Sequence, residues 1–283
     1  HKKHGVPVYL YCLDLWPESM RDNIPNTDSL IYRLLTRWCQ KLYNGAAKIG
    51  VTSPSFQDYL HDVCLVPREN ITYLPQHGED MLRWGSLEAA DNGVTDFVFM
   101  GNVGVAQDLE NVARAVSLIH TAQPFLVHIV GIGPDLENLK KTVAQLGVAD
   151  YFRFHGRHPL EKMPDSYRLA DACLLTLYAD NAAGLTIPGK LQGYMSAGKP
   201  VIAAIGGGAA QVIAQSRCGL CAQPGKPEEL AEIMTRFMEQ PSQAAQMGKN
   251  GRAYFEKNFS LDVFTTHLEQ QLAALSNKNG GFA

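Results

Sequence analysis

The sequence predicts an α/β fold in which helices cover parallel β-sheets, divided between two domains. Three observations lead to this expectation. Apolar runs of strand length alternate with helical patterns along most of the chain, which is typical of parallel sheets. Glycine-containing turns follow three of these runs and precede helices. The length of 283 residues exceeds that of one typical domain.

Composition and charge narrow the class of protein. Apolar residues make up 46% and charged residues 19% of the chain, as in ordinary globular proteins. The net charge of −3 gives no sign of a nucleic-acid-binding surface. No apolar run approaches the ~20 residues that cross a bilayer. Six scattered cysteines suit the reduced, buried thiols of a cytoplasmic protein, and Cys218 and Cys221 lack the second ligand pair of a zinc site.

Residues 1–90 are expected to form half of a doubly wound sheet followed by a linker. Short apolar runs have the character of buried strands, and amphipathic patterns separate them. The expected strands and helices alternate, at residues 6–13, 29–45, 48–52, 56–63 and 71–74. The segment from 76 to 95 is polar and lacks periodicity, so it is the expected linker, with a short helical turn at 81–84.

Residues 91–258 are expected to form a second domain of the same type. Its strands are predicted at residues 96–100, 125–130, 151–154, 172–177, 201–205 and 218–221. Its helices are predicted at 108–120, 134–146, 164–170, 188–198, 208–215, 227–238 and 244–258. Such regular alternation produces a parallel sheet between two layers of helices. One more helix, at 260–275, lies in the remaining segment 259–283.

The helix predicted from Pro188 has both ends marked and carries an unusual charge. Proline suits a first helical position, while Gly198 and Pro200 end the helix. Lys190 lies in the first turn, where a cation is unfavourable unless an anion lies beside it. The helix follows a buried strand, and this edge of a parallel sheet is where ligands bind. We therefore expect Lys190 to hold a phosphate, the alternative being a solvated surface lysine.

Three glycine turns point to the same kind of ligand. Gly101 and Gly104, Gly131 and Gly133, and the run 206–208 each separate a strand from a helix. Glycine there allows a ligand to approach the backbone, and helix starts favour anions. None of these turns is a dinucleotide fingerprint, and the chain has no Walker A pattern. The turns indicate a phosphorylated ligand of nucleotide type, or glycines needed only for tight turns.

Eight motifs, in this order and spacing, resemble one family. They are DLWPES at 14–19, FMGNVGVAQ at 99–107, VGIGP at 130–134, FRFHG at 152–156, MPDSY at 163–167, TIPGKL at 186–191, YMSAGKP at 194–200 and CGL at 218–220. The family is that of the retaining GT-B glycosyltransferases numbered 4, in its bacterial surface-polysaccharide branch. The resemblance covers residues from about 9 to 270.

The resemblance implies two Rossmann-like domains that transfer sugar from a UDP- or GDP-sugar to a glycan or lipid-linked acceptor, without a cofactor or metal. No Asp-x-Asp metal pair occurs in the sequence. Lys190 is expected to stabilise the leaving diphosphate, and Asp14 and Glu18 to orient the acceptor. The residues expected at the donor are Gly101, Asn102, Gly104, Gly131, Gly133, Arg157, His158, Thr186, Ile187, Pro188, Lys190 and Leu191.

We expect a cytoplasmic protein, and peripheral contact with the inner face of the plasma membrane is left open. The resemblance assigns residues 1–90 to the acceptor side, 91–258 to the donor side, and 259–283 to a helix that returns to the first domain. The first domain begins at the family's penultimate strands, so we expect it to be incomplete and the chain to be a fragment.

The chain departs from the family at two acidic positions. Many relatives carry two glutamates, separated by seven residues, that contact the donor sugar and the ribose. Here the positions are Leu185 and Gly193, so Gln192 or backbone would have to substitute. This departure keeps two alternatives open, namely a degenerate nucleotide-binding or scaffold partner and a sugar-nucleotide epimerase of the same fold.

Overall fold

The first domain of the structure contains a small parallel sheet. The structure, a computed structural model, describes residues 6–21, 24, 26–89, 91–178 and 185–278. The strand order is β1-β2-β3, and both pairings are parallel. The elements are β1 (Tyr9–Cys12), α1 (Leu30–Tyr43), β2 (Lys48–Val51), α2 (Pro54–Asp62) and β3 (Ile71–Tyr73).

Local sequence explains where these two helices begin. The Ser29 hydroxyl accepts a hydrogen bond from the backbone N–H of Tyr32 at 3.2 Å, which caps α1. α2 begins at Pro54, and the preceding Ser53 makes no capping bond with its side chain. Both helices turn apolar residues toward the sheet, where they form the core of the first domain with strand residues such as Ile49 and Val51.

The second domain contains a six-stranded sheet in the order β6-β5-β4-β7-β8-β9, and every neighbouring pair is parallel. Its strands are β4 (Thr95–Met100), β5 (Phe125–Val130), β6 (Phe152–Gly156), β7 (Ala172–Thr176), β8 (Val201–Ala204) and β9 (Gly219–Ala222). The direction of winding reverses between β4 and β7. Ligands of doubly wound sheets bind beyond the carboxyl ends of the strands at such a reversal.

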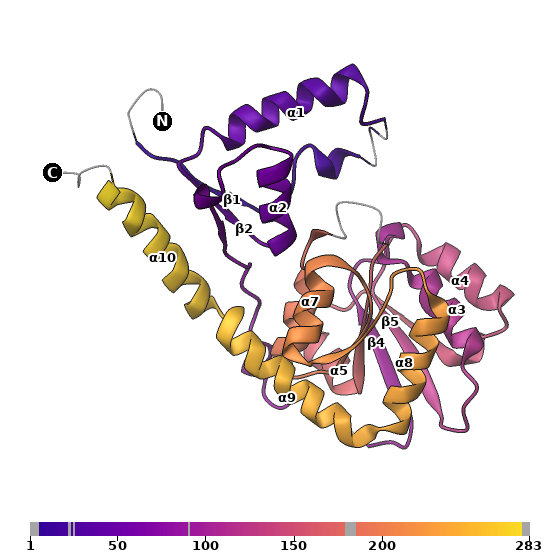
Figure 1. Cartoon of the computed structure of the whole chain (residues 1–283). Coiled ribbons are helices and arrows are strands. Elements are labelled where there is room, and N and C mark those ends of the chain that lie inside the picture. Colours follow the sequence, from indigo (N-terminus) through magenta and orange to yellow (C-terminus); the bar gives the residue numbers. More distant parts are fainter. Residues whose placement is uncertain (1–5, 22–23, 25, 90, 179–184, 279–283) are drawn as a thin grey trace.

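Helices cover both faces of this sheet (Figure 1). They are α3 (Leu109–Leu118), α4 (Leu136–Gln145), α5 (Met163–Leu169), α6 (Gly189–Ser196), α7 (Gly207–Ser216), α8 (Pro227–Glu239) and α9 (Pro241–Asn258). Strand β4 divides its side chains between the two cores, with Phe97 and Phe99 in one cluster and Val98 and Met100 in the other. The predicted α/β class with parallel sheets is confirmed.

Two of the helix starts that differ from the prediction lie at prolines. Pro188 was expected as the first helical residue, but α6 begins at Gly189 and Pro188 is the residue before it, with extended backbone (ψ 136°). α9 begins at Pro241 rather than at residue 244, because proline suits a first helical turn whatever the polarity of the residues around it. The difference of one residue at α6 lies within the usual uncertainty of helix ends, and the difference of three residues at α9 exceeds it.

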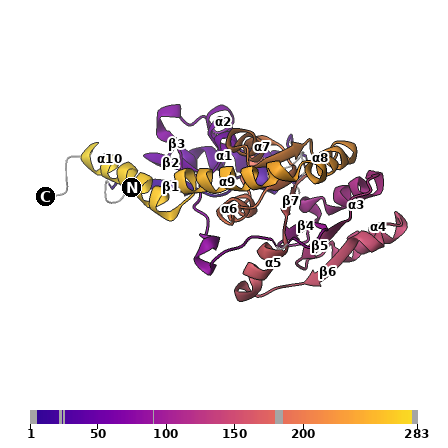
Figure 2. The same cartoon turned by 90° about the horizontal axis from the view of Figure 1, so that it is seen from below.

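The last helix, α10 (Leu261–Lys278), runs from the second domain to the first (Figures 1 and 2). The ring of Phe264 lies 5.6 Å from that of Tyr11 on β1. Thr72 on β3 donates a hydrogen bond of 3.4 Å to the side-chain oxygen of Gln271. Within the part of the chain that the structure describes, no helix combines the length and the apolarity that a membrane span requires.

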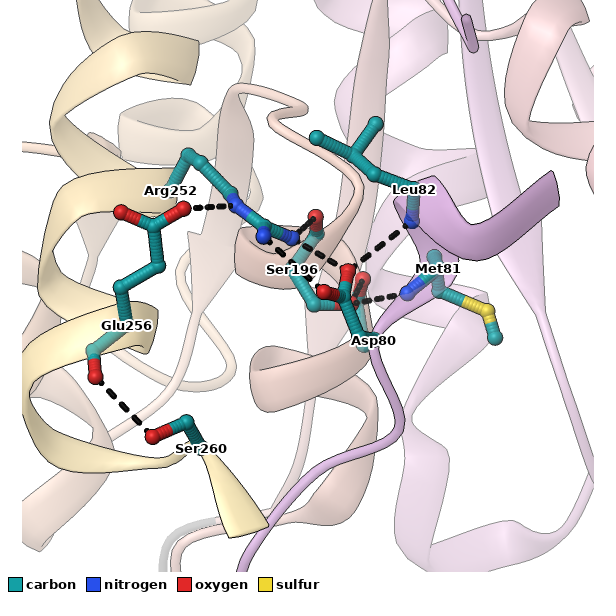
Figure 3. Close-up of polar contacts among 8 residues, drawn as sticks. Asp80, Met81, Leu82, Ser196, Arg252, Glu256 and Ser260 are labelled. Carbon is teal, nitrogen blue, oxygen red and sulfur yellow. Dashed lines mark hydrogen bonds and ion pairs between the residues drawn. The ribbon is translucent and has the colours of Figure 1, made fainter. Parts of the chain in front are cut away.

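The linker between the sheets is fastened to the second domain (Figure 3). Asp80 forms two contacts with the guanidinium of Arg252 on α9, at 2.5 and 3.0 Å. Arg252 also donates to the carbonyl of Ser196 at 2.8 Å, and the hydroxyl of Ser196 accepts from the N–H of Met81 at 3.3 Å. The predicted helical turn at Met81–Trp84 is present as a 3-10 turn.

Candidate functional site

A cavity of about 720 Å³ lies beyond the carboxyl ends of β4, β5 and β6. One wall is the first turn of α6, and the opposite wall is the linker, from Gln76 to Glu79. Its charged side chains come from Lys190, Arg157 and Glu79. Six of the residues expected at the donor line it: Gly101, Asn102, Gly131, Arg157, His158 and Lys190.

Lys190 is directed into the second domain rather than into bulk solvent. Its ammonium lies 4.1 Å from the centre of the Phe99 ring and donates a hydrogen bond to the side-chain oxygen of Gln107. Burial lowers the pKa of Lys190 to about 8, and among the described residues no carboxylate forms an ion pair with it. The cation expected at a helix start therefore lines the cavity and is half-buried.

The turns after β4 and β5 are pressed against each other. Gly101 has a φ of +133°, which side-chain-bearing residues rarely adopt, and a Cβ there would lie 2.6 Å from Cε of Lys190. A Cβ at Gly131 would overlap the carbonyl oxygen of Gly101, and one at Gly133 would overlap that of Val103. Glycine is thus required at positions 131 and 133 for backbone packing.

Two of the expected glycines lie outside the cavity lining. Gly104 precedes the 3-10 turn Val105–Gln107, and a Cβ there would meet the amide nitrogen of Asn102 at 2.9 Å. Gly133 packs against Val103 as described above. The sequence could not separate these glycines from Gly101 and Gly131, because all four follow strands at the same edge of the sheet.

The residues around the start of α6 divide into two groups. Ile187 and Leu191 are buried in the apolar cluster beneath the cavity, at 9% and 0% exposure. Thr186 and Pro188 precede the helix and, like those two, do not line the cavity. These four residues shape the helix start, while Lys190 and Gly189 form the surface that a ligand would meet.

Arg157 and His158 follow β6 and form another part of the wall. His158 shares a hydrogen bond of 2.9 Å between its Nδ1 and the hydroxyl of Ser166. Behind them, His155 lies 2.9 Å from Nδ1 of His128, whose Nε2 lies 2.8 Å from the buried carboxylate of Asp96. Burial, with the neighbouring imidazoles, lowers the pKa of His155.

Asp14 and Glu18 do not line this cavity. Asp14 borders a separate, mainly apolar hollow of about 380 Å³ between β1 and α1, together with Trp16 and Trp38. The carboxylate of Glu18 pairs with Arg21 at 2.6 Å and accepts a hydrogen bond from Tyr32 at 3.4 Å. Glu18 therefore makes its contacts within the first domain.

The two positions at which the family acids are absent have structural partners of their own. A side chain at Gly193 would come within 2.9 Å of the hydroxyl of Tyr167, so that tyrosine fills the space beside it. Leu185 packs against the apolar core of the first domain. Gln192 is 2% exposed, and its amide donates to the carbonyl of Gln76 at 2.7 Å, which fixes the linker wall.

Several wall residues escaped the sequence analysis. The linker contributes Gln76, His77 and Glu79, and α5 and α6 contribute Tyr167 and Tyr194. The linker was recognised only by its polarity, which does not indicate where it folds. Gly78 was the residue in the sequence that could have indicated close packing of the linker. A side chain at this position would meet Gln192 and Phe255 at 2.9 Å.

The family model described as "Glycosyl transferases group 1" matches residues 88–254, which is more than half of the chain. The chain belongs to the group 1 glycosyl transferases. It is 25% identical over 278 residues to the "Probable glycosyltransferase WbjE" of Pseudomonas aeruginosa. It is 26% identical over 142 residues to a "D-inositol 3-phosphate glycosyltransferase" of Streptomyces avermitilis.

This group 1 chain spans part of each of these relatives. The match to WbjE covers 90% of the chain and 65% of WbjE, and that to the Streptomyces protein covers 48% and 30%. Among solved structures, HepE of Anabaena in complex with UDP is similar, with a TM-score of 0.78 and 16% identity over 95% of this chain and 72% of HepE. WaaG, a glycosyltransferase involved in lipopolysaccharide biosynthesis, is similar with a TM-score of 0.69 and 16% identity, over 98% and 76%. The fold is therefore GT-B.

Proposed function

We propose that this protein transfers a sugar from a nucleoside diphosphate sugar to a glycan or lipid-linked acceptor, with retention, in surface polysaccharide biosynthesis. The observation that carries the proposal is the position of Lys190. Its ammonium lines a cavity at the switch point of the sheet, in the first turn of a helix. Family membership supports the proposal, as do the structures of HepE that contain UDP and UDP-glucose.

The proposed chemistry depends on charge rather than on a bound cofactor. Negative charge develops on the departing diphosphate, and backbone N–H groups at the start of α6 stabilise it together with Lys190. Arg157 and His158 would contact the base, and the turn at Gly101 and Asn102 would lie beside the diphosphate or the transferred sugar. Glycine at 101 lets backbone and ammonium reach the same anion.

The proposed division of labour follows the two sheets. Residues 91–258 would bind the donor and residues 1–90 the acceptor, with Asp14 and Glu18 orienting it. Residues 259–283 would supply a helix that crosses back to the first domain. We also propose a cytoplasmic location with peripheral contact at the inner face of the plasma membrane. These assignments rest on the family resemblance.

Calorimetric titration with UDP, GDP and the matching nucleosides tests the donor site. Lys190→Ala is expected to weaken binding of the diphosphate about 10- to 100-fold, because a hydrogen bond to a charged group contributes ~1.5–3 kcal/mol. Nucleoside affinity should stay unchanged. Lys141→Ala, at an exposed position on α4, is the matched control. Equal losses for diphosphate and nucleoside, or no nucleotide binding by the unaltered protein, would contradict the proposal.

A second candidate is a nucleotide-binding partner that transfers no sugar. It is favoured by Leu185, whose apolar side chain packs into the first domain and cannot contact a sugar hydroxyl through a hydrogen bond. Diphosphate binding that depends on Lys190, combined with an absence of sugar transfer to lipid-linked acceptors, would favour this candidate over the transferase.

A further inference from the structure

The turn after β4 ends at Gln107, whose side chain reaches the α6 cation. The side-chain oxygen of Gln107 accepts a hydrogen bond from the ammonium of Lys190, although the two residues lie 83 positions apart. Gln107 belongs to the same turn as Gly101 and Asn102, which line the cavity. The contact therefore joins the two cavity walls that the proposed diphosphate would touch.

The backbone of Gln107 is held on both sides. Its N–H donates to the carbonyl of Gly104 at 2.9 Å, within the 3-10 turn. Its carbonyl accepts from the hydroxyl of Thr176 at the end of β7, a side chain with no solvent exposure. The backbone of Gln107 is thus fixed by two hydrogen bonds, so its side-chain oxygen can hold the Lys190 ammonium in a defined position.

The acceptor that meets Lys190 carries no charge. An ammonium has three N–H donors, so one bond to Gln107 leaves two for a phosphate. The face of Phe99, 4.1 Å away, and the turn at Gly101 also lie beside the Lys190 side chain, and both are neutral. A carboxylate in place of the amide would neutralise the cation and repel a phosphate. A neutral acceptor orients the cation and leaves its charge to the ligand.

We propose that Gln107 is a positioning residue for the donor, holding the Lys190 ammonium at the cavity wall with its full charge directed to the diphosphate. The inference rests on the proposed function, since it requires that Lys190 binds the phosphates. It also explains how a half-buried cation is held in one orientation: the amide oxygen of Gln107 and the aromatic face of Phe99 both contact it.

A pH profile separates this role from a merely structural one. Burial lowers the pKa of Lys190 to about 8, so diphosphate affinity should begin to fall above about pH 8, as the ammonium loses its proton. Removing the acceptor destabilises the charged form, which moves this onset to lower pH. A carboxylate at position 107 moves it to higher pH. The other titratable side chains facing the cavity are His77, Glu79, Arg157, His158, Tyr167 and Tyr194.

The experiment is calorimetric titration of UDP and uridine between pH 6.5 and 9.5, with Gln107→Met and Gln107→Glu. Gln107→Met has nearly the same shape and is expected to weaken UDP binding about 10-fold at pH 8, with an earlier onset of the decline. Gln107→Glu should weaken UDP binding at pH 7 and delay the onset. Uridine affinity should be unchanged in both. Gln145→Met, at an exposed position on α4, is the matched control.

The outcomes separate this inference from the function on which it rests. If Lys190→Ala weakens UDP binding but Gln107→Met matches the unaltered protein in affinity and onset, only the role of Gln107 is overturned. If the unaltered protein binds neither UDP nor GDP, both are overturned. If Gln107→Met does not fold, Gln107→Glu decides, since an onset that stays the same with a carboxylate at this position overturns the inference.

Discussion

At the scale of single residues, the shape of the cavity depends on glycine positions as much as on residues with side chains. Gly131 is the clearest case, because its Cβ would occupy the position of the Gly101 carbonyl oxygen, which belongs to backbone and cannot rotate away. The close contact of the two turns lets the walls after β4 and β5 share one surface. Glycine at position 131 therefore acts mainly by allowing the two turns to pack closely, and this packing shapes the cavity that a ligand would enter.

Gly131→Ala is accordingly expected to lower the free energy of unfolding by about 1–3 kcal/mol, as overpacking does in other cores. It should weaken UDP binding as well, because the turn at Gly101 must shift. Thermal unfolding and titration with UDP measure the two effects. Gly206→Ala is the control, since its Cβ would have only an ordinary contact of 3.7 Å with Pro224. Equal unfolding midpoints for the two variants would contradict this account.

Single positions also show what the sequence could and could not predict about the site. The start of α6 was predicted to within one residue, because proline and glycine act on their immediate backbone. The partner of Lys190 was not predicted, since Gln107 lies 83 positions away and its contact arises from the packing of α6 against the β4 turn. The linker wall was missed for the same reason, because Gln76 and Gln192 are 116 positions apart.

At the scale of elements, the beginning of α2 in the first domain meets the beginning of α7 in the second. A Cβ at Gly208 would lie 2.8 Å from the hydroxyl oxygen of Ser53 and 3.6 Å from Pro54. Ser53 is fully buried, and its hydroxyl has no hydrogen-bond partner. The glycine run 206–208 was expected to serve a ligand, and at Gly208 the structure shows contact between helices.

Ser53→Ala is therefore expected to leave stability unchanged or to raise it, because an unpaired buried hydroxyl costs about 1–3 kcal/mol. Gly208→Ala should be destabilising in the unaltered protein and less so in the Ser53→Ala protein. A double-mutant cycle should give a coupling of about 0.5 kcal/mol or more. Any change in helix propensity at position 208 is common to both backgrounds and cancels. Additive effects in the unfolding midpoints would show that the two helices do not press on each other here.

At the scale of the whole molecule, the pair between Asp80 and Arg252 holds the linker on the second domain (Figure 3). The Asp80 side chain is half exposed and that of Arg252 is 20% exposed, so solvent screening limits the strength of the pair. The hydrogen bond to Arg252 lowers the pKa of Asp80. The stabilisation is complete above the ordinary carboxyl pKa of about 4 and is lost as the pH falls through the lower folded value.

Asp80→Asn is expected to reduce the free energy of unfolding by about 1 kcal/mol at pH 7, and by less as the pH falls below 4. Amide hydrogen exchange in the turn Met81–Trp84 should become faster, since the pair with Arg252 holds in place the Asp80 side chain that accepts from the N–H of Leu82 at 3.0 Å. Glu137→Gln, which breaks an exposed pair with Lys140 on α4, is the control and should leave that turn unaffected. Unchanged exchange in Asp80→Asn would show that the linker is held without this pair.

The sequence predicted the strands and helices of the whole molecule better than the contacts between its two domains. Alternation of apolar runs with helical patterns predicted the strands of both sheets, because each run responds to burial on two faces. Nothing local indicates that Leu185 packs into the first domain, since an apolar residue after a strand suits any buried position.

In the part of the chain that the structure describes, two passages connect the two sheets, one through the linker and one at the step from α9 to α10. These passages touch: the N–H of Gly78 donates to the carbonyl of Phe259 at 2.9 Å, and the ring of His77 lies 5.3 Å from that of Phe264. A backbone hydrogen bond therefore joins the two passages where the described chain changes domain. A rotation of one domain against the other about Gly78 and Phe259 would keep this bond, whereas lateral sliding of one domain past the other would break it.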